Sequence, residues 1–527
     1  MAAATPLLGH FLIAINGFVQ ARNEIQLADY LVLEPPFGPH YVRMIEELRT
    51  HYPSGSEDAI EAKCQQLLAA AREGAEGSPW SAFVKFMAQY LRHLRDVDPD
   101  PRRYLETYEL LSELQLRANS ALAHGALGSL MLPVVVANAR LVCRLAIGLD
   151  KQPQLMAHLR SAQHGGAGPG EDDGGTRETL PERAANILRT AFVTCLNDRV
   201  SGVDDAGRPQ GKKRGIYRIA NLCLRILFQC RKTRNATQIF ENIHLLSPPL
   251  AAYPKCERVT YLYYLGRFLF QHSHFARASL ALQYAYDQSP ARPDCVSQRR
   301  LLLVYLITSN ILLGRFPSLP HLLSRPEAAG MAPHFSPICA AIRSGDLSAF
   351  RTHLDFTSPS ADWFLRFRIL LPLRNRGEVL VWRSLVRRTW CLAGVLPRDP
   401  LSRAAPTITI SALATAFTFA TRSSSAHDYD ALAIESVLSS LIDQGLLGGF
   451  ISHRQAKFAI TGSKIKGGPL RAGFPLPSAV LSARAQAGEP RPGEVPGWKQ
   501  AASTSTGGLL GPGSVVKLSG ARPVGVF

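Results

Sequence analysis

The side chains of this sequence best suited to bind a ligand are five basic residues near its C-terminal end, Arg454, Lys457, Lys464, Lys466 and Arg471. No acidic residue occurs anywhere in residues 451–488. Lysine and arginine side chains on a short exposed segment neutralise phosphate groups, and such contacts do not depend on base sequence. The pattern therefore predicts a nucleic-acid-binding surface. The alternative interpretation is a strand and tail whose charges only face water.

Motifs for catalysis are missing from the sequence. GRPQGK at residues 207–212 resembles a phosphate-binding loop, but one spacer residue is missing and Lys213 stands where Ser or Thr would bind Mg²⁺. GGAGPG at residues 165–170 lacks the strand and helix of a dinucleotide fingerprint. The histidines form no HExxH motif, no Cys/His cluster has zinc spacing, and no GxSxG elbow occurs. We predict no catalytic residue, no cofactor and no metal, and hence no enzyme.

Positive charge is distributed unevenly along the 527 residues, whose formal net charge is +18. Lys and Arg minus Asp and Glu give −5 for residues 1–130, +7 for 131–250, +12 for 251–425 and +4 for 426–527. An excess of this size favours a polyanionic partner, either nucleic acid or an acidic protein subunit. GKKR at residues 211–214 and RKTR at 231–234 are either nuclear-localisation signals or solvated helix surfaces.

The elements that position these residues are predicted to be helices. Residues 258–290 have the spacing of one tetratricopeptide-like helical hairpin, with Gly266, Ala278, Ala285 and Pro290 at its small and terminal positions. Small residues let two antiparallel helices approach closely, and such a hairpin must stack on neighbours to bury its apolar face. Tyr261 and Tyr264 lie on one helical face, and we expect them to pack against the next repeat rather than stack on bases.

The predicted fold is mainly α. Helical repeats occupy residues 1–160 and 179–404 and flank a flexible Gly-rich insertion at 161–178, whose composition cannot bury enough apolar surface. Residues 405–480 contain helical patterns at 407–422 and 428–444, followed by two short β-like runs, which is the layout of a winged helix. Residues 481–527 lack periodicity and are predicted to be a disordered tail.

The cellular setting is predicted from cysteines and apolar segments. The nine cysteines are scattered and form no CxxC pair, which indicates buried, reduced thiols in an intracellular protein. The N-terminus has no basic region before its apolar residues, and polar residues interrupt the most apolar window, at 127–149. We expect a soluble protein of the nucleus and cytoplasm.

Helical repeats that end in a winged helix resemble the architecture of PCI-domain proteins. ERVTYLYYLGR, the LLGRFP around Gly314, GKKRGIYRIANLCLRILF and LIDQGLLGGFISHRQAKFAIT are similar to strings of the COP9 signalosome subunit 12 homologue family. That family is related to the PCI subunit of the TREX-2 mRNA-export complex. The resemblance covers roughly residues 10–480 without the insertion, and it implies that the helical part of a PCI domain begins at about residue 240.

The resemblance implies a non-catalytic subunit. Its expected partners are a second PCI-domain protein, a small acidic disordered subunit, and RNA or DNA, with no membrane. The expected function is a scaffold or adaptor that links proteins to nucleic acid in transcription-coupled mRNA processing or export. The alternative is a structural subunit of the COP9 signalosome with no nucleic-acid binding.

Overall fold

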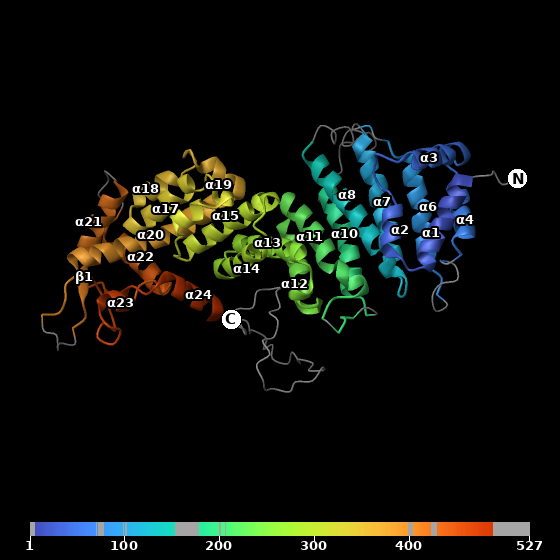
Figure 1. Ribbon diagram of the computed structural model, residues 1–527. Helices are drawn as coiled ribbons and strands as arrows, with labels where there is room; N and C mark the ends of the chain where they lie inside the picture. Colours follow the sequence, from blue (N-terminus) through green and yellow to red (C-terminus); the bar gives the residue numbers. More distant parts are fainter. Residues whose placement is uncertain are drawn as a thin grey trace, which may run out of the picture.

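The protein is elongated, with helices standing side by side from the N-terminal end to the winged helix at the other (Figure 1). The computed structural model describes residues 6–69, 71, 78–98, 100, 103–152, 179–199, 202–205, 207–398, 404–422 and 429–487. The insertion predicted at 161–178 lies outside the described residues, as does the predicted tail from residue 488 onward.

The N-terminal half of the solenoid consists of helices and short 3-10 turns, as the residue pattern predicts. The helices are α1 (Pro6–Gln20), α2 (Glu24–Tyr30), α3 (Pro39–His51), α4 (Glu57–Leu67), α6 (Ser81–Asp96), α7 (Tyr104–Leu122), α8 (Leu132–Asp150) and α10 (Leu180–Leu196). The turns are η3 (Gly128–Met131) and η4 (Gly211–Gly215). A capping box begins α10, in which Thr179 and the Glu182 side chain satisfy each other's backbone donors.

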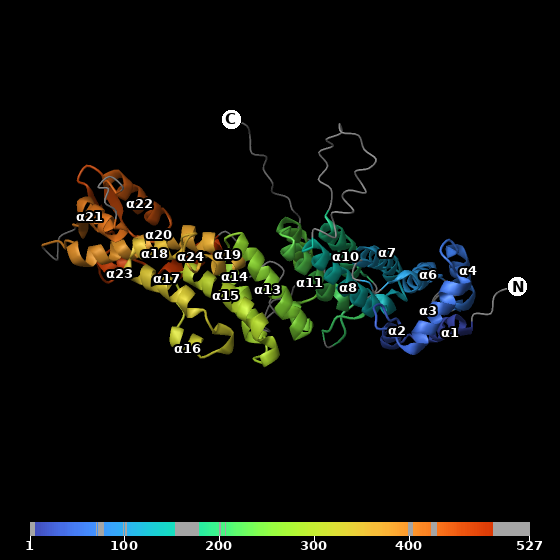
Figure 2. The ribbon, with the colours of Figure 1, turned by 90° about the horizontal axis from the view of Figure 1, so that it is seen from above.

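The second half continues the same stack toward the winged helix. Its helices are α11 (Ile216–Gln229), α12 (Thr237–Leu246), α13 (Lys255–Gln271), α14 (Phe275–Gln288), α15 (Val296–Leu312), α16 (Leu319–Leu323), α17 (Ala332–Ser344), α18 (Leu347–His353), α19 (Ala361–Phe367) and α20 (Leu370–Ala393). Its 3-10 turns are η5 (Thr233–Ala236), η6 (Leu250–Ala252), η7 (Pro293–Cys295) and η8 (Pro326–Ala328). Seen from above, the two halves follow each other along one long axis (Figure 2).

The predicted helical hairpin is confirmed as α13 and α14. A Cβ built on Gly266 would lie 2.5 Å from Cγ of Leu282, so only glycine allows the two helices to come this close. Ala278 and Ala285 are fully buried in the same contact. Tyr261 is also fully buried, which confirms its expected burial, but its ring contacts Tyr217 of α11 and Phe240 of α12, which precede it in the chain.

One helix has the length and composition of a membrane span. Residues Gly128–Asp150, which comprise η3 and α8, have a mean hydropathy of 1.8 over their most apolar window. Of that window, 67% is buried inside the protein, where α8 packs between α7, α10 and α11. The helix therefore belongs to the solenoid core.

The prediction that the cysteines are buried, reduced thiols is confirmed for some of the nine cysteines. All nine are free, and those at positions 64, 143, 195, 223 and 339 are buried. Burial raises the pKa of the Cys223 thiol to about 12, so this thiol stays protonated and unreactive. Cys256 and Cys391 are exposed, in contrast to the prediction.

A winged helix follows α20, as predicted, but its start is a strand rather than a helix. β1 (Thr407–Thr409) precedes α21 (Ile410–Thr421), α22 (Ala431–Asp443), β2 (Phe450–Ser452) and β3 (Lys457–Ala459). The prediction of one continuous helix over residues 407–422 was therefore wrong. β1 pairs with β3, and such a partner from a distant segment cannot be predicted from local propensity. The Thr409 side chain caps α21 by accepting a hydrogen bond from the Ala412 N–H.

The ordered chain extends beyond the predicted boundary at residue 480. α23 (Pro469–Gly473) and α24 (Pro477–Ala487) follow the wing, and α24 returns along the solenoid to contact α14 (Figure 1). Two glycines accommodate this return, because the Cβ that Gly314 lacks would lie 2.8 Å from Pro477 and that of Gly445 3.0 Å from Val480. These contacts explain why residues 481–487, which have no apolar periodicity, form a helix.

Candidate nucleic-acid and partner interface

The candidate site is the wing, a small antiparallel sheet in the strand order β1-β3-β2. β3 is the central strand, and its Lys457 lies opposite Thr409 of β1 and Ser452 of β2. Phe458 is fully buried, so β3 anchors the wing to the core, while Lys457 at the start of the strand is half-buried. The sequence runs GGFIS and AKFAIT thus form the predicted hairpin.

Two of the predicted cations lie at the hairpin turn. Arg454 is exposed between β2 and β3, and Lys457 is half-buried at the start of β3. The fold also brings an acidic residue to this turn, because the Glu435 carboxylate of α22 lies 2.9 Å from Nδ1 of His453. Residues 451–488 contain no acidic residue, but the surface around them does, because the fold adds Glu435 from α22.

The other three cations lie beyond the opposite end of β3. Lys464 and Lys466 are exposed on a tight turn, and Arg471 is exposed on α23. Positive φ angles at Gly462, Gly467 and Gly468 shape this turn, since glycine adopts them without strain. Within this turn, Lys466 lies beside Gly462 and Arg471 lies beside Gly467.

The structure thus divides the five cations into two groups separated by β3. None of the five forms an ion pair with a carboxylate within the described part of the chain. Unpaired, exposed cations remain available to phosphate groups, whereas a paired cation must first give up its partner. Two groups on opposite ends of a strand suit an extended polyanion better than a single small anion.

The two edges of the wing sheet differ. β1 is covered in part by Val395, whose N–H donates to the Thr407 carbonyl at 2.8 Å and whose carbonyl accepts from the Thr407 N–H at 3.0 Å. On the side of β2 away from β3, no backbone hydrogen bond joins it to another described segment. Phe450 of β2 is 51% exposed. An unpaired edge with an exposed aromatic side chain can accept a strand or loop from another protein.

Two features of the surroundings could not be found from sequence. Arg383 of α20 donates to the carbonyls of Phe474 and Pro475 and so holds the segment after the wing, and burial lowers its pKa to about 10. A groove of about 800 Å³ lies between α17, α20 and α21, beside the exposed apolar residues Leu392 and Phe419. No local pattern links these elements, because they meet only in the fold.

The cluster GKKR at residues 211–214 is largely structural. Lys212 is 4% exposed and its Nζ lies 3.7 Å from the Asp198 carboxylate. Arg214 forms an ion pair of 2.5 Å with Glu24. Of RKTR at residues 231–234, Lys232 pairs with Glu182 at 3.0 Å, whereas Arg231 and Arg234 are exposed.

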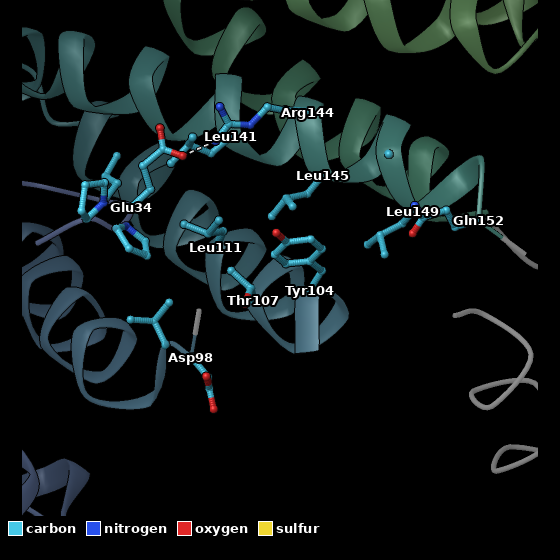
Figure 3. Close-up of a pocket in the computed structure, with 15 residues that line it drawn as sticks. Glu34, Asp98, Tyr104, Thr107, Leu111, Leu141, Arg144, Leu145, Leu149 and Gln152 are labelled. Atoms are coloured by element: carbon cyan, nitrogen blue, oxygen red, sulfur yellow. Dashed lines mark hydrogen bonds and ion pairs between the residues drawn. The ribbon is translucent and has the colours of Figure 1, made fainter. Parts of the chain in front are cut away.

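Figure 3 shows a pocket of about 610 Å³ in the N-terminal half, between α7, α8 and the loop after α2. Its walls are mostly apolar, with Leu111, Leu141 and Leu145 among them, and its rim carries the ion pair of Glu34 with Arg144. The labelled side chains bring together no acid and base of the kind that hydrolysis needs. Among the residues that the structure describes, no group of three or more His, Cys, Asp or Glu could hold a metal ion.

Fold and site together define a class of helical-repeat protein that ends in a winged helix. No family model matches the chain. The chain is 28% identical to a PCI domain-containing protein of Schizosaccharomyces pombe over 386 residues. The aligned region covers 72% of this chain and 78% of that protein. It is 27% identical to the "Protein CSN12 homolog" of Mycosarcoma maydis over 61% of this chain and 67% of that protein. It is 26% identical to "PCI domain-containing protein 2" of Danio rerio over 53% of this chain and 62% of that protein.

These similarities confirm the predicted resemblance to PCI-domain proteins of the CSN12 type. They support a scaffold subunit of a PCI-containing complex. The mainly α fold with a C-terminal winged helix is the structural counterpart of that similarity.

Proposed function

We propose that this chain is a non-catalytic adaptor that joins a second PCI-domain protein through its winged helix and presents nucleic acid to the assembly. The complex would be TREX-2-like or of the subunit 12 type and would act in transcription-coupled mRNA processing or export, in the nucleus and cytoplasm. The observation that carries the proposal is the wing, which combines an open sheet edge with unpaired cations.

The open edge supports the protein partner. β2 is short, and its exposed Phe450 offers apolar contact area at a strand whose outer backbone groups bond to no other described segment. Two winged helices that meet edge to edge would bury that ring and satisfy those backbone groups. The excess of +12 in residues 251–425 supports the small acidic disordered subunit, because an acidic chain would neutralise part of it.

A second candidate function is a structural subunit of the COP9 signalosome without nucleic-acid binding. The observation that favours it is the name of several relatives, which are called CSN12 homologs. Under this alternative the wing cations would face water or an acidic surface of a neighbouring subunit.

Affinity purification of the full chain followed by mass spectrometry separates the two candidates. We expect a second PCI protein together with RNA-processing or export factors, whereas a set of signalosome subunits would support the alternative. The variant Phe450→Lys should lose the PCI partner, because it places a charge in the apolar contact. Leu245→Lys is the matched control, since Leu245 is 71% exposed on α12, away from the wing. Equal losses in both variants would contradict docking at β2.

RNA binding by the full chain tests the cations of the wing. Five phosphate contacts on a single strand predict a slope of about −3.5 in a plot of log affinity against log salt, at roughly 0.7 per contact. The triple variant Lys457, Lys464 and Lys466→Glu should weaken binding and flatten the slope. Reversal of Lys85, Lys255 and Arg292, which are exposed on the solenoid, changes the net charge equally and serves as the control. A flat salt response of the unmodified chain would contradict the nucleic-acid part of the proposal.

A further inference from the structure

Four arginines gather in the middle of the solenoid, far along the chain from the wing. We define the arginine row as Arg225 and Arg231 from α11 and its C-terminal end, Arg267 of α13, and Arg368 directly after α19. The helices α11, α13, α15 and α19 lie next to one another in both views of the molecule (Figures 1 and 2). Arg225, Arg231 and Arg368 are exposed, and Arg267 is half-buried.

Arg267 is held by aromatic rings instead of a carboxylate. Its guanidinium carbon lies 5.0 Å from the centre of the Phe228 ring, 5.2 Å from that of Tyr305 and 5.5 Å from that of Tyr263. It donates one hydrogen bond of 3.1 Å to the Tyr263 hydroxyl, and its Nε is buried without a partner. Aromatic faces stabilise the cation and fix its position, but they leave most of its hydrogen-bond donors unused.

Contacts around Arg267 bring the ends of α11 and α19 to the same place. Phe228, which Arg267 covers, lies three residues before Arg231. The Tyr305 hydroxyl donates to the carbonyl of Phe367 at 2.9 Å, and Arg368 is the next residue. Burial, together with the nearby charges of Arg231 and Arg267, lowers the pKa of Arg368. Arg231, Arg267 and Arg368 thus lie near one another, and like charges so placed repel.

No direct ion pair offsets this repulsion in the described part of the chain, although the carboxylates of Asp150 and Glu182 lie near the neighbouring Cys230. Within the described residues, none of the four arginines forms an ion pair, although the neighbouring Lys232 pairs with Glu182. Arg231 and Arg368 also have left-handed backbones, with φ of 64° and 57°, a conformation that glycine adopts at lower cost. The helix dipole favours a cation at the C-terminal ends of α11 and α19, but it does not account for Arg267 in the middle of α13.

We infer that the arginine row binds the phosphate backbone of single-stranded nucleic acid, at a site separate from the wing. This inference rests on the proposed function. Arg225 lies on α11, Arg231 beyond the C-terminal end of α11, Arg267 on α13 and Arg368 after α19. Because the cations come from separate elements, we expect them to contact more than one phosphate group. Tyr263 and Tyr264 are half-buried beside them, and partly exposed rings next to cations are typical of sequence-tolerant single-strand binding.

The left-handed conformation allows a test that removes charge without harming the fold. In the double variant Arg231→Gly with Arg368→Gly, glycine suits both backbones, so folding should be retained. Binding of a fluorescently labelled oligouridylate by the full chain is measured across a range of salt concentrations. We expect roughly 10- to 30-fold weaker binding near 0.1 M salt and a log–log slope smaller by about 1.4, for two lost phosphate contacts.

The chain offers a matched control in Arg22 and Arg422. Both are exposed arginines with left-handed backbones, with φ of 51° and 52°, and both lie outside the row. The double variant Arg22→Gly with Arg422→Gly therefore makes the same chemical change and removes the same charge. It should bind RNA as the unmodified chain does. If the two double variants bind RNA equally well, the arginine row is not a nucleic-acid site.

Further outcomes of the RNA-binding experiment distinguish a failure of this inference from a failure of the proposed function. Loss of RNA binding in the wing variant alone, with unchanged binding in the Arg231 and Arg368 variant, overturns the inference and leaves the proposed function intact. No RNA binding by the unmodified chain overturns both. Polyglutamate is the second probe, because a row that binds it and does not bind RNA would be a site for an acidic protein, which also overturns the inference.

Discussion

Two neighbouring regions of the solenoid hold an arginine in opposite ways. Between α14, α15 and η8, Arg299 is 7% exposed and its guanidinium lies 2.9 Å from the Glu327 carboxylate. The same carboxylate accepts from the Tyr286 hydroxyl at 2.6 Å. In the arginine row, Arg267 is surrounded by rings and has no carboxylate. The charge of Arg299 is therefore neutralised by a carboxylate within the fold, whereas Arg267 keeps hydrogen-bond donors that have no acceptor among the described residues.

The comparison suggests how structural and ligand-binding cations differ in this protein. Burial alone would raise the pKa of Glu327, but its hydrogen bonds with Tyr286 and Arg299 hold the pKa below its usual value. The charges of that cluster therefore cancel within the fold. The charges of the arginine row and of the wing form no such pairs. They account for part of the excess of +7 in residues 131–250, of +12 in 251–425 and of +4 in 426–527.

The largest expected effect comes from breaking the paired region. Glu327→Ala leaves Arg299 buried without its counter-ion and should lower the free energy of unfolding by about 3–5 kcal/mol. Denaturant-induced unfolding of the full chain, followed by circular dichroism, measures the loss. Glu378→Ala is the control, because the side chain of its partner Arg351 is 44% exposed and reaches water. The loss should therefore stay below about 1 kcal/mol. Similar losses in both variants would show that burial of the pair does not matter.

The next effect tests the packing that positions Arg267. Gly266→Val places side-chain atoms against Leu282 and should lower the free energy of unfolding by about 1–3 kcal/mol. It should also weaken RNA binding, since α13 carries Arg267. Gly17→Ala in α1 meets no atom within 4 Å and should raise stability by about 0.5–1 kcal/mol. A stable Gly266→Val variant would mean that α13 and α14 can separate without cost.

A smaller effect concerns a buried base in the N-terminal half. His93 is fully buried, its Nε2 lies 3.0 Å from the Leu33 carbonyl, and burial lowers its pKa although the nearby Asp96 opposes the shift. The unfolded state therefore binds a proton more readily than the folded state. Stability should fall as the pH drops through the ordinary histidine pKa toward the lowered folded value.

His93→Gln keeps a donor for the Leu33 carbonyl and removes the titration. Thermal unfolding between pH 7 and pH 5 should therefore depend less on pH in this variant than in the unmodified chain. An unchanged pH dependence would assign it to other groups, such as His334, whose pKa burial also lowers.

The smallest expected effect is on the stability of a variant that lacks two arginines of the arginine row. Arg231→Gly with Arg368→Gly should change the free energy of unfolding by less than about 1 kcal/mol, because relief of the left-handed backbone offsets the loss of two helix-end cations. The same unfolding measurement as for Glu327→Ala checks it. A loss of several kcal/mol would show that these arginines support the fold, as Arg299 does.

Sequence patterns predicted the main elements because they depend on local spacing. Gly266 with Ala278 and Ala285 indicated a close helical hairpin, and the runs GGFIS and AKFAIT indicated the wing. The strand Thr407–Thr409 was missed because its partner β3 lies some fifty residues away in the chain. Residues 481–487 were assigned to a disordered tail because their helix depends on contacts with α14 and with glycines 314 and 445.

The candidate sites show the same division. The five wing cations could be named from the sequence, but the Glu435 carboxylate at the hairpin and the separation of the cations by β3 could not. Of the arginine row, only Arg231 belonged to a basic run that the sequence showed, RKTR at 231–234. The row as a set could not be predicted, because its members are spread over residues 225–368.

The amino-acid sequence by itself determined the helical repeat, the wing and the surplus of positive charge, since periodicity, small residues and composition act over a few turns of chain. The tertiary structure alone decided which charges are cancelled. An ion pair such as Arg299 with Glu327, or an uncompensated set such as the arginine row, exists only when distant segments are brought within a few ångströms by packing.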